Sequence, residues 1–526
     1  MLRYLPLLLS VILALIGCVL VATASLHWLW LAIPFLLLTG VGFYDLFFAS
    51  NNVLRNYPLL GYLRFASEEL RPELHQYFVE SDTDGAPFNR NSRQIVYERA
   101  EDEHEERSFG TELDVYEAGY EWLTHSINPR QASQTQFRVL IGGDACRHPY
   151  EMALLNVSSM SFGSLSANAI LALNGGARLG GFAHATGEGG LSPYHLRPGG
   201  DLVWEIGTAY FGCRDKNGHF DPEQFQEKAA EPAVKCITIK LSQGAKPGLG
   251  GVMPATKMTE EIAKTRGVPA HEKCVSPPGH SEFDSPLTLL DFIRRLRDLS
   301  DAKPVGFKLC VGRRSEFLGI CKAMLQTEIL PDYIIVDGGE GGTGAAPLEY
   351  EDHIGAPLTE GLHFVHQSLV ACGLRRQIKL GCSGKVDSAF EMIRRLSQGA
   401  DYCNAARPMM FALGCIQARI CETNCCPTGI TTQDPTRTRG LLPEVKQYRV
   451  RNYQHSTVME FNQMIASLGL SSPDQLSPEL LLRRVNSTTV KSYAEIFYQA
   501  EENELLTAPP AEFWQRDWEQ ASSEHF

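Results

Sequence analysis

Four cysteines stand within twelve residues in the stretch LGCIQARICETNCCPTGITTQ, residues 413–433. Their intervals include no C-x-x-C pair, so neither a zinc ribbon nor a thioredoxin-type redox pair fits. Cys415, Cys421 and either Cys425 or Cys426 therefore form a close set of three thiols. The fourteen cysteines of this long chain show no small-scaffold pattern, which favours reduced thiols in a cytosolic environment, a few of them recruited for chemistry. Packing as small buried hydrophobes is the alternative.

Lysines and tight turns follow several apolar segments farther upstream. Lys240 and Lys308 stand within apolar runs, and Lys246 follows in the segment KLSQGAKPGLGG. Cations placed there could hold an anionic substrate or stabilise a reduced flavin. The loops GCSGK (381–385) and NAARP (404–408) precede helix starts, where backbone amides and the helix dipole favour a phosphate group. The alternative is that the glycines of such loops merely permit tight turns.

Eight short apolar runs, mostly alternating with amphipathic stretches, must position these residues. The runs are 152–160, 180–186, 202–208, 235–242, 304–311, 332–339, 377–383 and 401–406. The stretches 285–301 and 388–400 have the periodicity of amphipathic helices. Eight strands over roughly 250 residues predict an α/β fold, a (β/α)₈ barrel of the TIM type, with functional residues at the carboxyl ends of the strands. A doubly wound open sheet is the alternative.

The N-terminus carries two apolar segments long enough to cross a bilayer, at about residues 5–25 and 28–48. Arg3 precedes them, several arginines follow them, and the link between them has no Lys or Arg. The positive-inside rule therefore predicts a two-span anchor in the cell (inner) membrane, with the catalytic domain facing the cytoplasm. The alternative is a signal peptide, because LIGC ending at Cys18 resembles a lipoprotein cleavage box.

These features predict four parts along the chain. They are a transmembrane hairpin (1–50), a linker and N-terminal extension (51–145), a barrel (146–440) that includes the cysteine loop 415–426, and a C-terminal helical extension (441–526). The net charge of −13 and the absence of a basic stripe argue against nucleic-acid binding. No Rossmann-type dinucleotide-binding unit is recognised in the sequence, so we do not expect direct binding of NAD(P)H.

Several segments, in order, resemble one known family. They are MSFGSLS, TGEGG, KLSQGAKPG, DGGEGGTGAAP and the cysteine motif C-x5-C-x4-C-P. Over about residues 110–435 they resemble the FMN-binding synthase domain of the large subunit of glutamate synthase. The resemblance implies a TIM-type barrel that binds FMN, and a 3Fe–4S cluster held by Cys415, Cys421 and Cys426. Soft thiolates close in sequence suit such a cluster. Cys425 is an extra position that could replace Cys426 or bind a fourth iron.

The resemblance also implies roles for individual positions. Glu188, Lys246 and Lys308 are expected to be catalytic, and Ser161, Gln243 and Lys246 are expected to bind substrate. The expected FMN contacts are Met160, Ser161, Lys240, Lys308, Gly381, Ser383, Gly384, Ala405 and Ala406. Glu188 either handles protons or places ammonia, or it is simply exposed. Leu249 and Val252 stand where the family usually has Glu and Gln, which leaves the identity of the substrate open.

The implied reaction is the reductive amination of 2-oxoglutarate to L-glutamate, an oxidoreductase activity on CH–NH2 donors. An apolar hairpin, rather than a glutaminase domain, precedes the barrel, so ammonia is expected from solution or from a partner. Ferredoxin or a membrane dehydrogenase is the expected electron donor. One alternative keeps the cofactors but uses another 2-oxo acid or forms an N-alkylated glutamate. Another is a membrane-anchored electron-transfer or scaffold flavoprotein without turnover.

Overall fold

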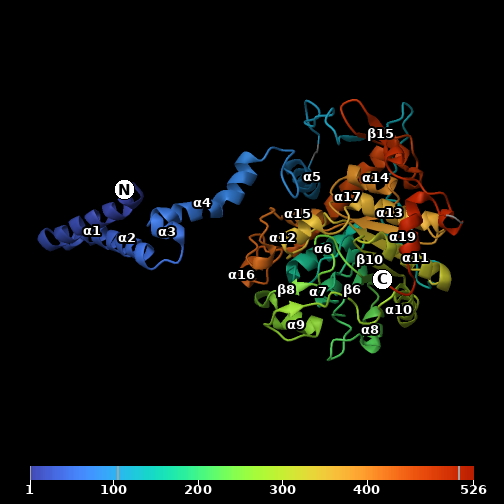
Figure 1. Ribbon diagram of the computed structural model, residues 1–526, viewed down its shortest axis with the longest axis horizontal. Coiled ribbons are helices and arrows are strands. Elements are labelled where there is room, and N and C mark those ends of the chain that lie inside the picture. The colour runs from blue at the N-terminus through green and yellow to red at the C-terminus, as the bar shows by residue number, and fades with distance from the viewer. Residues whose placement is uncertain (1, 104–105, 508–509) are drawn as a thin grey trace. The chain divides into compact units, whose positions relative to one another are not determined.

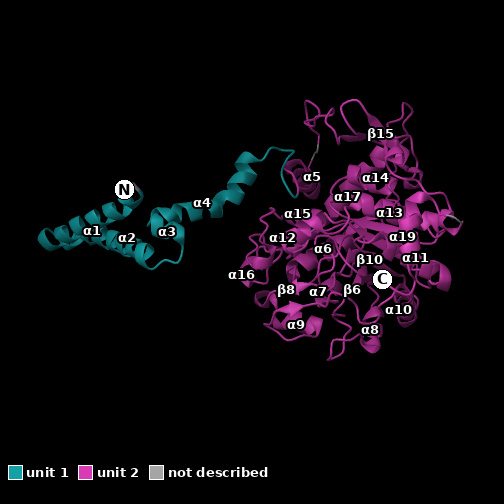
Figure 2. Cartoon of the chain, in the orientation of Figure 1, with its two compact units in different colours: residues 1–87 teal, residues 88–526 magenta. Residues whose placement is uncertain are grey.

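A computed structural model describes residues 2–103, 106–507 and 510–526, and the chain forms two compact units. The first unit ends at Pro87 and the second begins at Phe88 (Figure 2). The four-part division expected from the sequence is finer than this one and stays a prediction.

The first unit begins with two apolar helices, α1 (Leu5–Thr23) and α2 (Leu29–Phe47), which pack against each other. Small residues allow the close approach, because a Cβ atom at Gly17 would lie only 2.8 Å from the Cα atom of Ala32. The apolar windows of the two segments have mean hydropathies of 2.9 and 1.7. Two helices long and apolar enough to cross a membrane are thus confirmed at the predicted places. The shorter helices α3 (Asn52–Asn56) and α4 (Leu60–Leu74) follow.

A closed barrel of eight parallel strands forms the centre of the second unit (Figure 1). The strands are β4 (Leu155–Val157), β5 (His184–Ala185), β6 (Leu202–Ile206), β7 (Val234–Lys240), β10 (Val305–Leu309), β11 (Tyr333–Asp337), β12 (Lys379–Ser383) and β13 (Tyr402–Ala405). The ring closes where β13 pairs with β4, with Asn404 opposite Asn156. Each strand overlaps one predicted apolar run, so the (β/α)₈ barrel is confirmed and the open sheet is excluded.

Side chains fill the interior of the barrel near the amino ends of its strands. A buried cluster takes residues from five strands around the ring, including Val203, Cys236, Tyr333 and Tyr402. An antiparallel hairpin, β2 (Arg138–Ile141) and β3 (Tyr150–Ala153), adds Ile141 and Met152 to the same cluster. This end of the barrel is therefore packed, and the carboxyl ends of the strands are left for binding and chemistry.

Helices alternate with the strands and cover the barrel (Figure 1). They are α6 (Ala167–Gly180), α7 (Pro193–Leu196), α8 (Pro222–Ala229), α9 (Glu260–Arg266), α10 (Pro286–Leu299), α11 (Arg314–Thr327), α12 (Leu348–His353), α13 (Leu358–Ala371), α14 (Ala389–Ser397) and α15 (Arg407–Leu413). Helices α10 and α14 lie in the two stretches with helical periodicity. Ser285 and Ser388 cap them by accepting backbone hydrogen bonds from their first turns, which fixes where each helix begins.

Segments before and after the barrel pack together on it. Helix α5 (Arg90–Glu101) contacts the long helix α17 (Pro443–Ser467), which also lies along α6. A small antiparallel sheet joins β1 (Glu121–Leu123), β14 (Leu481–Arg484) and β15 (Val490–Ser492). The tail after residue 440 thus holds two strands besides α17, α18 (Tyr493–Ile496) and α19 (Glu512–Gln520). The predicted helical extension did not include these strands, because strands of three or four residues show little periodicity.

Two buried histidines lead to a prediction about acid stability. His184 on β5 and His195 on α7 are fully buried, with ring centroids 5.3 Å apart. Burial lowers the pKa of His184 to about 3 and also lowers the pKa of His195. An unfolded histidine titrates near pH 6.5, so below that pH the unfolded chain binds protons that the folded chain does not. Between pH 7 and pH 5 we expect His184 alone to reduce the free energy of unfolding by about 2 kcal/mol.

Denaturant unfolding of the detergent-solubilised chain at pH 7 and at pH 5 measures this loss. Neither ring nitrogen of His184 has a hydrogen-bond partner among the described residues, so a His184→Leu variant removes the titrating group without breaking a hydrogen bond. Its loss of stability between the two pH values should be smaller than that of the unsubstituted chain. An equal loss in both proteins would contradict the role given to His184.

Candidate active site

Two lysine–glutamate ion pairs stand at the carboxyl ends of the strands. The Nζ atom of Lys240, the last residue of β7, lies 3.1 Å from Oε2 of Glu188, which follows β5. The Nζ atom of Lys308 in β10 lies 2.5 Å from Oε2 of Glu205 in β6, and the Ser159 hydroxyl donates to the same oxygen. Lys240 and Lys308 are opposite each other in the β7–β10 register. Two buried cations therefore lie side by side, each with its own carboxylate.

Burial and charge act in opposite directions on these groups. Desolvation raises the pKa of Glu188, but Lys240 and other nearby cations outweigh this effect, and the pKa is lowered overall. Desolvation lowers the pKa of Lys308, but Glu205 and other nearby carboxylates raise it above its usual value. At neutral pH Glu188 is therefore a carboxylate able to accept a proton, and Lys308 is a fixed cation.

Sequence reasoning missed Glu205. Its signal was a single carboxylate inside the apolar run LVWEIGT, 202–208. A buried carboxylate needs a charged or hydrogen-bonding partner, so its presence in a barrel strand indicates a cation on another strand. Here that cation is Lys308.

Lys246 is buried against a carbonyl rather than a carboxylate. Its Nζ atom donates to the carbonyl oxygen of Ala345 at 3.0 Å, and the residue is 5% exposed. Desolvation lowers the pKa of Lys246, and Glu188 partly opposes this. Gln243 of the same loop lines a cavity of about 20 Å³ together with Glu188 and Lys240. An ammonium whose contact is a neutral oxygen keeps its charge for an anionic ligand, so this loop suits a carboxylate.

One carboxylate, Asp337 at the end of β11, ties three loops together. Its two oxygens accept hydrogen bonds from the amide of Gly244, at 2.8 Å, and from the hydroxyl of Ser383. A Cβ atom at Gly244 would lie 1.9 Å from the carbonyl oxygen of Gly338, so only glycine fits there. The loops after β7, β11 and β12 are therefore held in one arrangement around the barrel mouth.

Most of the predicted FMN contacts lie at the ends of three neighbouring strands. Met160 and Ser161 follow β4. Ser383 ends β12 and Gly384 follows it, and Ala405 ends β13 and Ala406 follows it just before α15. Ser161 donates to the hydroxyl of Ser164 at 3.0 Å. Gly381 lies within β12 instead, where the ring of Tyr402 occupies the space that a side chain would need. A phosphate site at the barrel mouth would therefore use the residues at the ends of β12 and β13 and the start of α15.

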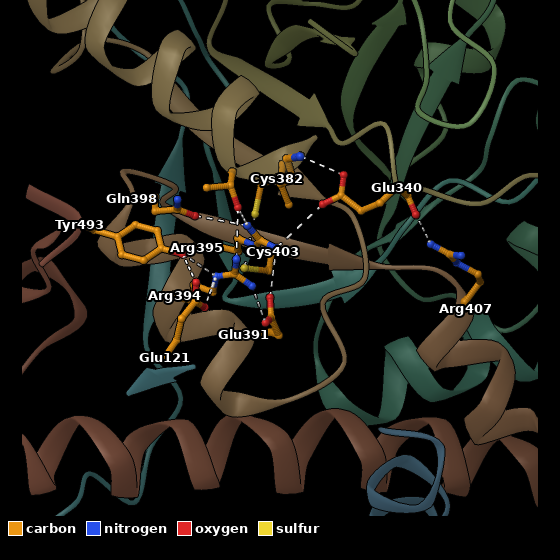
Figure 3. A network of polar contacts seen from close by, with 12 residues as sticks. Glu121, Glu340, Cys382, Glu391, Arg394, Arg395, Gln398, Cys403, Arg407 and Tyr493 are labelled. Atoms are coloured by element: carbon orange, nitrogen blue, oxygen red, sulfur yellow. Dashed lines mark hydrogen bonds and ion pairs between the residues drawn. The ribbon is translucent and has the colours of Figure 1, made fainter. Parts of the chain in front are cut away.

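A buried arginine network anchors the loop after β11 (Figure 3). The side-chain carboxylate of Glu340 accepts a hydrogen bond from the backbone amide of Leu358 at 2.9 Å. The backbone carbonyl of Glu340 accepts a hydrogen bond from the guanidinium of Arg407 at 2.7 Å. The other carboxylate oxygen of Glu340 lies 4.0 Å from Arg395 of α14. Arg395 is 3% exposed and pairs with Glu391 at 3.1 Å. The loop is thereby attached to the first turns of α13 and α15 and to α14.

Removing the buried guanidinium of this network should destabilise the fold. For Arg395→Met we expect a loss of about 3 kcal/mol in the free energy of unfolding, because the carboxylates of Glu391 and Glu340 lose a buried partner. Arg376 pairs with Glu502 at 3.0 Å but is 82% exposed, so Arg376→Met should cost less than about 1 kcal/mol. Denaturant unfolding of the two variants compares them directly. Equal losses would contradict a structural role for the network.

Cys415, Cys421 and Cys426 follow α15 and lie close enough for the charge of one thiolate to affect the pKa of another. Burial raises the pKa of Cys415 to about 12, and Cys421 and Cys426 add to this rise. Hydrogen bonding to Thr428 and a neighbouring threonine overcomes burial and lowers the pKa of Cys426 to about 7. Cys425 is exposed at the surface.

The cysteine loop offers no evident site for a single metal ion. Among the residues that the structure describes, no three histidine, cysteine or acidic side chains meet closely enough to bind one ion. In an iron–sulfur cluster each thiolate binds a different iron, so the sulfurs have to surround the group rather than converge on a point. Cys415 and Cys421 are partly buried and Cys426 is buried, whereas Cys425 is exposed.

Comparison with known proteins identifies the family. Residues 126–471 match the profile described as a conserved region in glutamate synthase, and this range contains the whole barrel and the cysteine loop. The chain belongs to the glutamate synthase family. The expected resemblance and an oxidoreductase of glutamate synthase type are thereby confirmed.

Individual relatives cover the chain to different extents. The glutamate synthase large subunit-like protein YerD of Bacillus subtilis (strain 168) is 34% identical over 89% of this chain and 97% of its own length. The archaeal glutamate synthase (NADPH) of Methanocaldococcus jannaschii is 32% identical over 61% of this chain and 60% of its own length. The glutamate synthase (NADPH) large chain of B. subtilis is 30% identical over 60% of this chain, and the match covers 20% of that protein.

Proposed function

We propose that the protein is an FMN- and iron–sulfur-dependent enzyme that converts 2-oxoglutarate and ammonia to L-glutamate. The observation that carries this proposal is the set formed by the partly buried Glu188 and the buried Lys240 and Lys246 beside the predicted FMN loops. The set combines a proton-accepting carboxylate with cations suited to a dicarboxylate, in a chain of the glutamate synthase family. Ammonia would come from solution or from a partner protein.

The FMN site is proposed from the predicted contact residues at the ends of β4, β12 and β13. Amides of Ser383, Gly384, Ala405 and Ala406 would hold the phosphate, and Met160 would lie against the flavin. When bound, FMN supplies the hydride that reduces the substrate imine. Lys308, kept charged by Glu205, would place a fixed positive charge beside the cofactor, which favours an anionic reduced form.

Substrate binding is assigned to the loops after β4 and β7. Lys246 and Gln243 would bind the substrate carboxylates, and the hydroxyl of Ser161 would orient the substrate. Glu188, paired with Lys240, would hold ammonia or accept a proton from ammonium before attack on the keto carbon. Because Lys240 and Lys246 are buried, their charges act more strongly than at the surface.

Electrons are proposed to enter through a 3Fe–4S cluster held by Cys415, Cys421 and Cys426. When bound, such a cluster passes electrons singly to the flavin. Helices α1 and α2 would anchor the protein in the membrane, with the catalytic unit in the cytoplasm. An anchored enzyme is suited to a membrane dehydrogenase or to ferredoxin as the donor.

Leu249 supports a second candidate substrate. It lines the cavity beside Gln243 and is 37% exposed, and Val252 nearby is 42% exposed. Apolar groups at this opening favour a different 2-oxo acid or an N-alkylated product. A pure electron carrier or scaffold would have no need of Lys246 and Glu188, so the structure favours an enzyme.

Cofactor and product analysis tests the proposal. Protein purified in detergent without oxygen should contain one FMN and about three irons per chain. Supplied with an artificial reductant, 2-oxoglutarate and 15N-ammonium, it should form 15N-glutamate. Both cofactors without glutamate would reject this substrate pair, and a screen of other 2-oxo acids and of alkylamines would then test the second candidate.

A further inference from the structure

Lys257 is a buried cation without a carboxylate partner. It ends a short 3₁₀ helix, Ala255–Lys257, after β8 (Val252–Met253), and is 4% exposed. Its Nζ atom donates to the carbonyl oxygen of Cys421 at 2.7 Å and to that of Ser164 at 3.4 Å. Within residues 2–103, 106–507 and 510–526, no carboxylate lies within ion-pair distance of this ammonium. Its hydrogen bonds are satisfied, but its charge is not neutralised.

Burying such a charge is costly unless a negative group lies near. The hydrogen bond to the carbonyl of Cys421 holds the ammonium against the cysteine loop. Glu422 is exposed to solvent, which screens its charge. Thiolates of the cysteine loop, when bound to iron, would supply the negative charge that Lys257 lacks.

Lys257 also bridges two functional loops. Ser164 belongs to the loop after β4, which carries Ser161, and Cys421 belongs to the cysteine loop. Other contacts fix the spacing of these loops: Ser166 donates to the carbonyl of Gly429 at 2.8 Å, and Gln433 donates to the carbonyl of Gly163 at 2.9 Å. The cation is thus held between the loop proposed to contact FMN and substrate and the loop proposed to bind iron.

We propose that Lys257 is the counter-ion of the iron–sulfur cluster and raises its reduction potential. A fixed positive charge beside the cluster stabilises the reduced, more negative state over the oxidised one. Reduction of the cluster by the donor is then easier. The inference rests on the proposed cluster and adds a residue outside the cysteine motif.

A redox titration of the anaerobically purified full chain, followed by the EPR signal of the oxidised cluster, tests this role. Lys257→Met should lower the cluster potential by at least about 59 mV, which is a tenfold change in the one-electron equilibrium constant. Lys257→Gln can still donate to the carbonyls but carries no charge, so it should shift the potential in the same direction. Lys257→Arg should stay near the original value, as should Lys264→Met on the exposed surface of α9.

The outcomes separate charge from hydrogen bonding. An unshifted potential in Lys257→Gln would overturn the proposal, because hydrogen bonds alone would then suffice. If Lys257→Met does not fold or bind iron, the glutamine and arginine variants still decide the matter. Iron and sulfide content of the unsubstituted protein is measured first. If the unsubstituted protein contains no iron and sulfide, the proposed cluster is rejected, and with it the role of Lys257, before any variant is compared.

Discussion

Replacing Lys246 with methionine should lower glutamate formation by about 100- to 1,000-fold while FMN stays bound. The Lys246 ammonium is buried, and its contact is the neutral carbonyl of Ala345, so its charge is available to a substrate carboxylate. Methionine has nearly the same length and keeps the packing but has no charge. The measurement is kcat/KM for 2-oxoglutarate, with bound flavin quantified from its absorbance in the same samples.

A matched control separates site chemistry from net charge. Lys216 lies exposed in the loop after β6, and Lys216→Met should keep at least half of the activity. Full activity of the Lys246→Met enzyme would remove Lys246 from the substrate site. Loss of flavin from that variant would instead indicate a role in holding the cofactor loops.

Replacing Cys426 with serine should remove most of the iron, while replacing Cys425 with serine should leave about three irons per chain. Cys426 is buried, and its Sγ atom lies 3.4 Å from the hydroxyl of Thr428, whereas Cys425 is exposed. Electron transfer from an external donor to the flavin should slow by at least about 100-fold in the Cys426 variant, because the route through the cluster is lost. Iron, acid-labile sulfide and the rate of flavin reduction are the measurements.

Direct photochemical reduction of the flavin provides the control for this pair. The Cys426→Ser protein reduced in this way should still transfer its electrons to substrate, because the barrel mouth is unchanged. Equal iron loss in the Cys425 and Cys426 variants would contradict the assignment of Cys426 alone.

Local signals predicted the barrel well. Even β5, with only His184 and Ala185 in the strand, was found, because an apolar run bounded by glycines marks a buried parallel strand. The loop lysines were found for a similar reason, since a cation inside an apolar run stands out. The helices α10 and α14 followed from their amphipathic periodicity, whereas the apolar runs located the strands but not their exact ends.

Long-range pairings were not predictable from such signals. Lys308 and Glu205 are 103 residues apart, and their contact depends on the order and register of the closed ring. Glu340 and Arg395 meet because two successive loops and helices pack together, which no local pattern encodes. The position of Gly381 within β12, against Tyr402, also depends on where the strand ends. Residue types indicated the chemistry, and closure of the barrel determined the partners.

The most direct test of the account is a single turnover without oxygen. The flavin of the purified protein is reduced, mixed with 2-oxoglutarate, ammonium or both, and followed by its absorbance. We expect rapid reoxidation only with both substrates, together with one glutamate formed per flavin. Flavin that stays reduced with both substrates present, or that is reoxidised equally without ammonium, would contradict glutamate synthesis by this barrel.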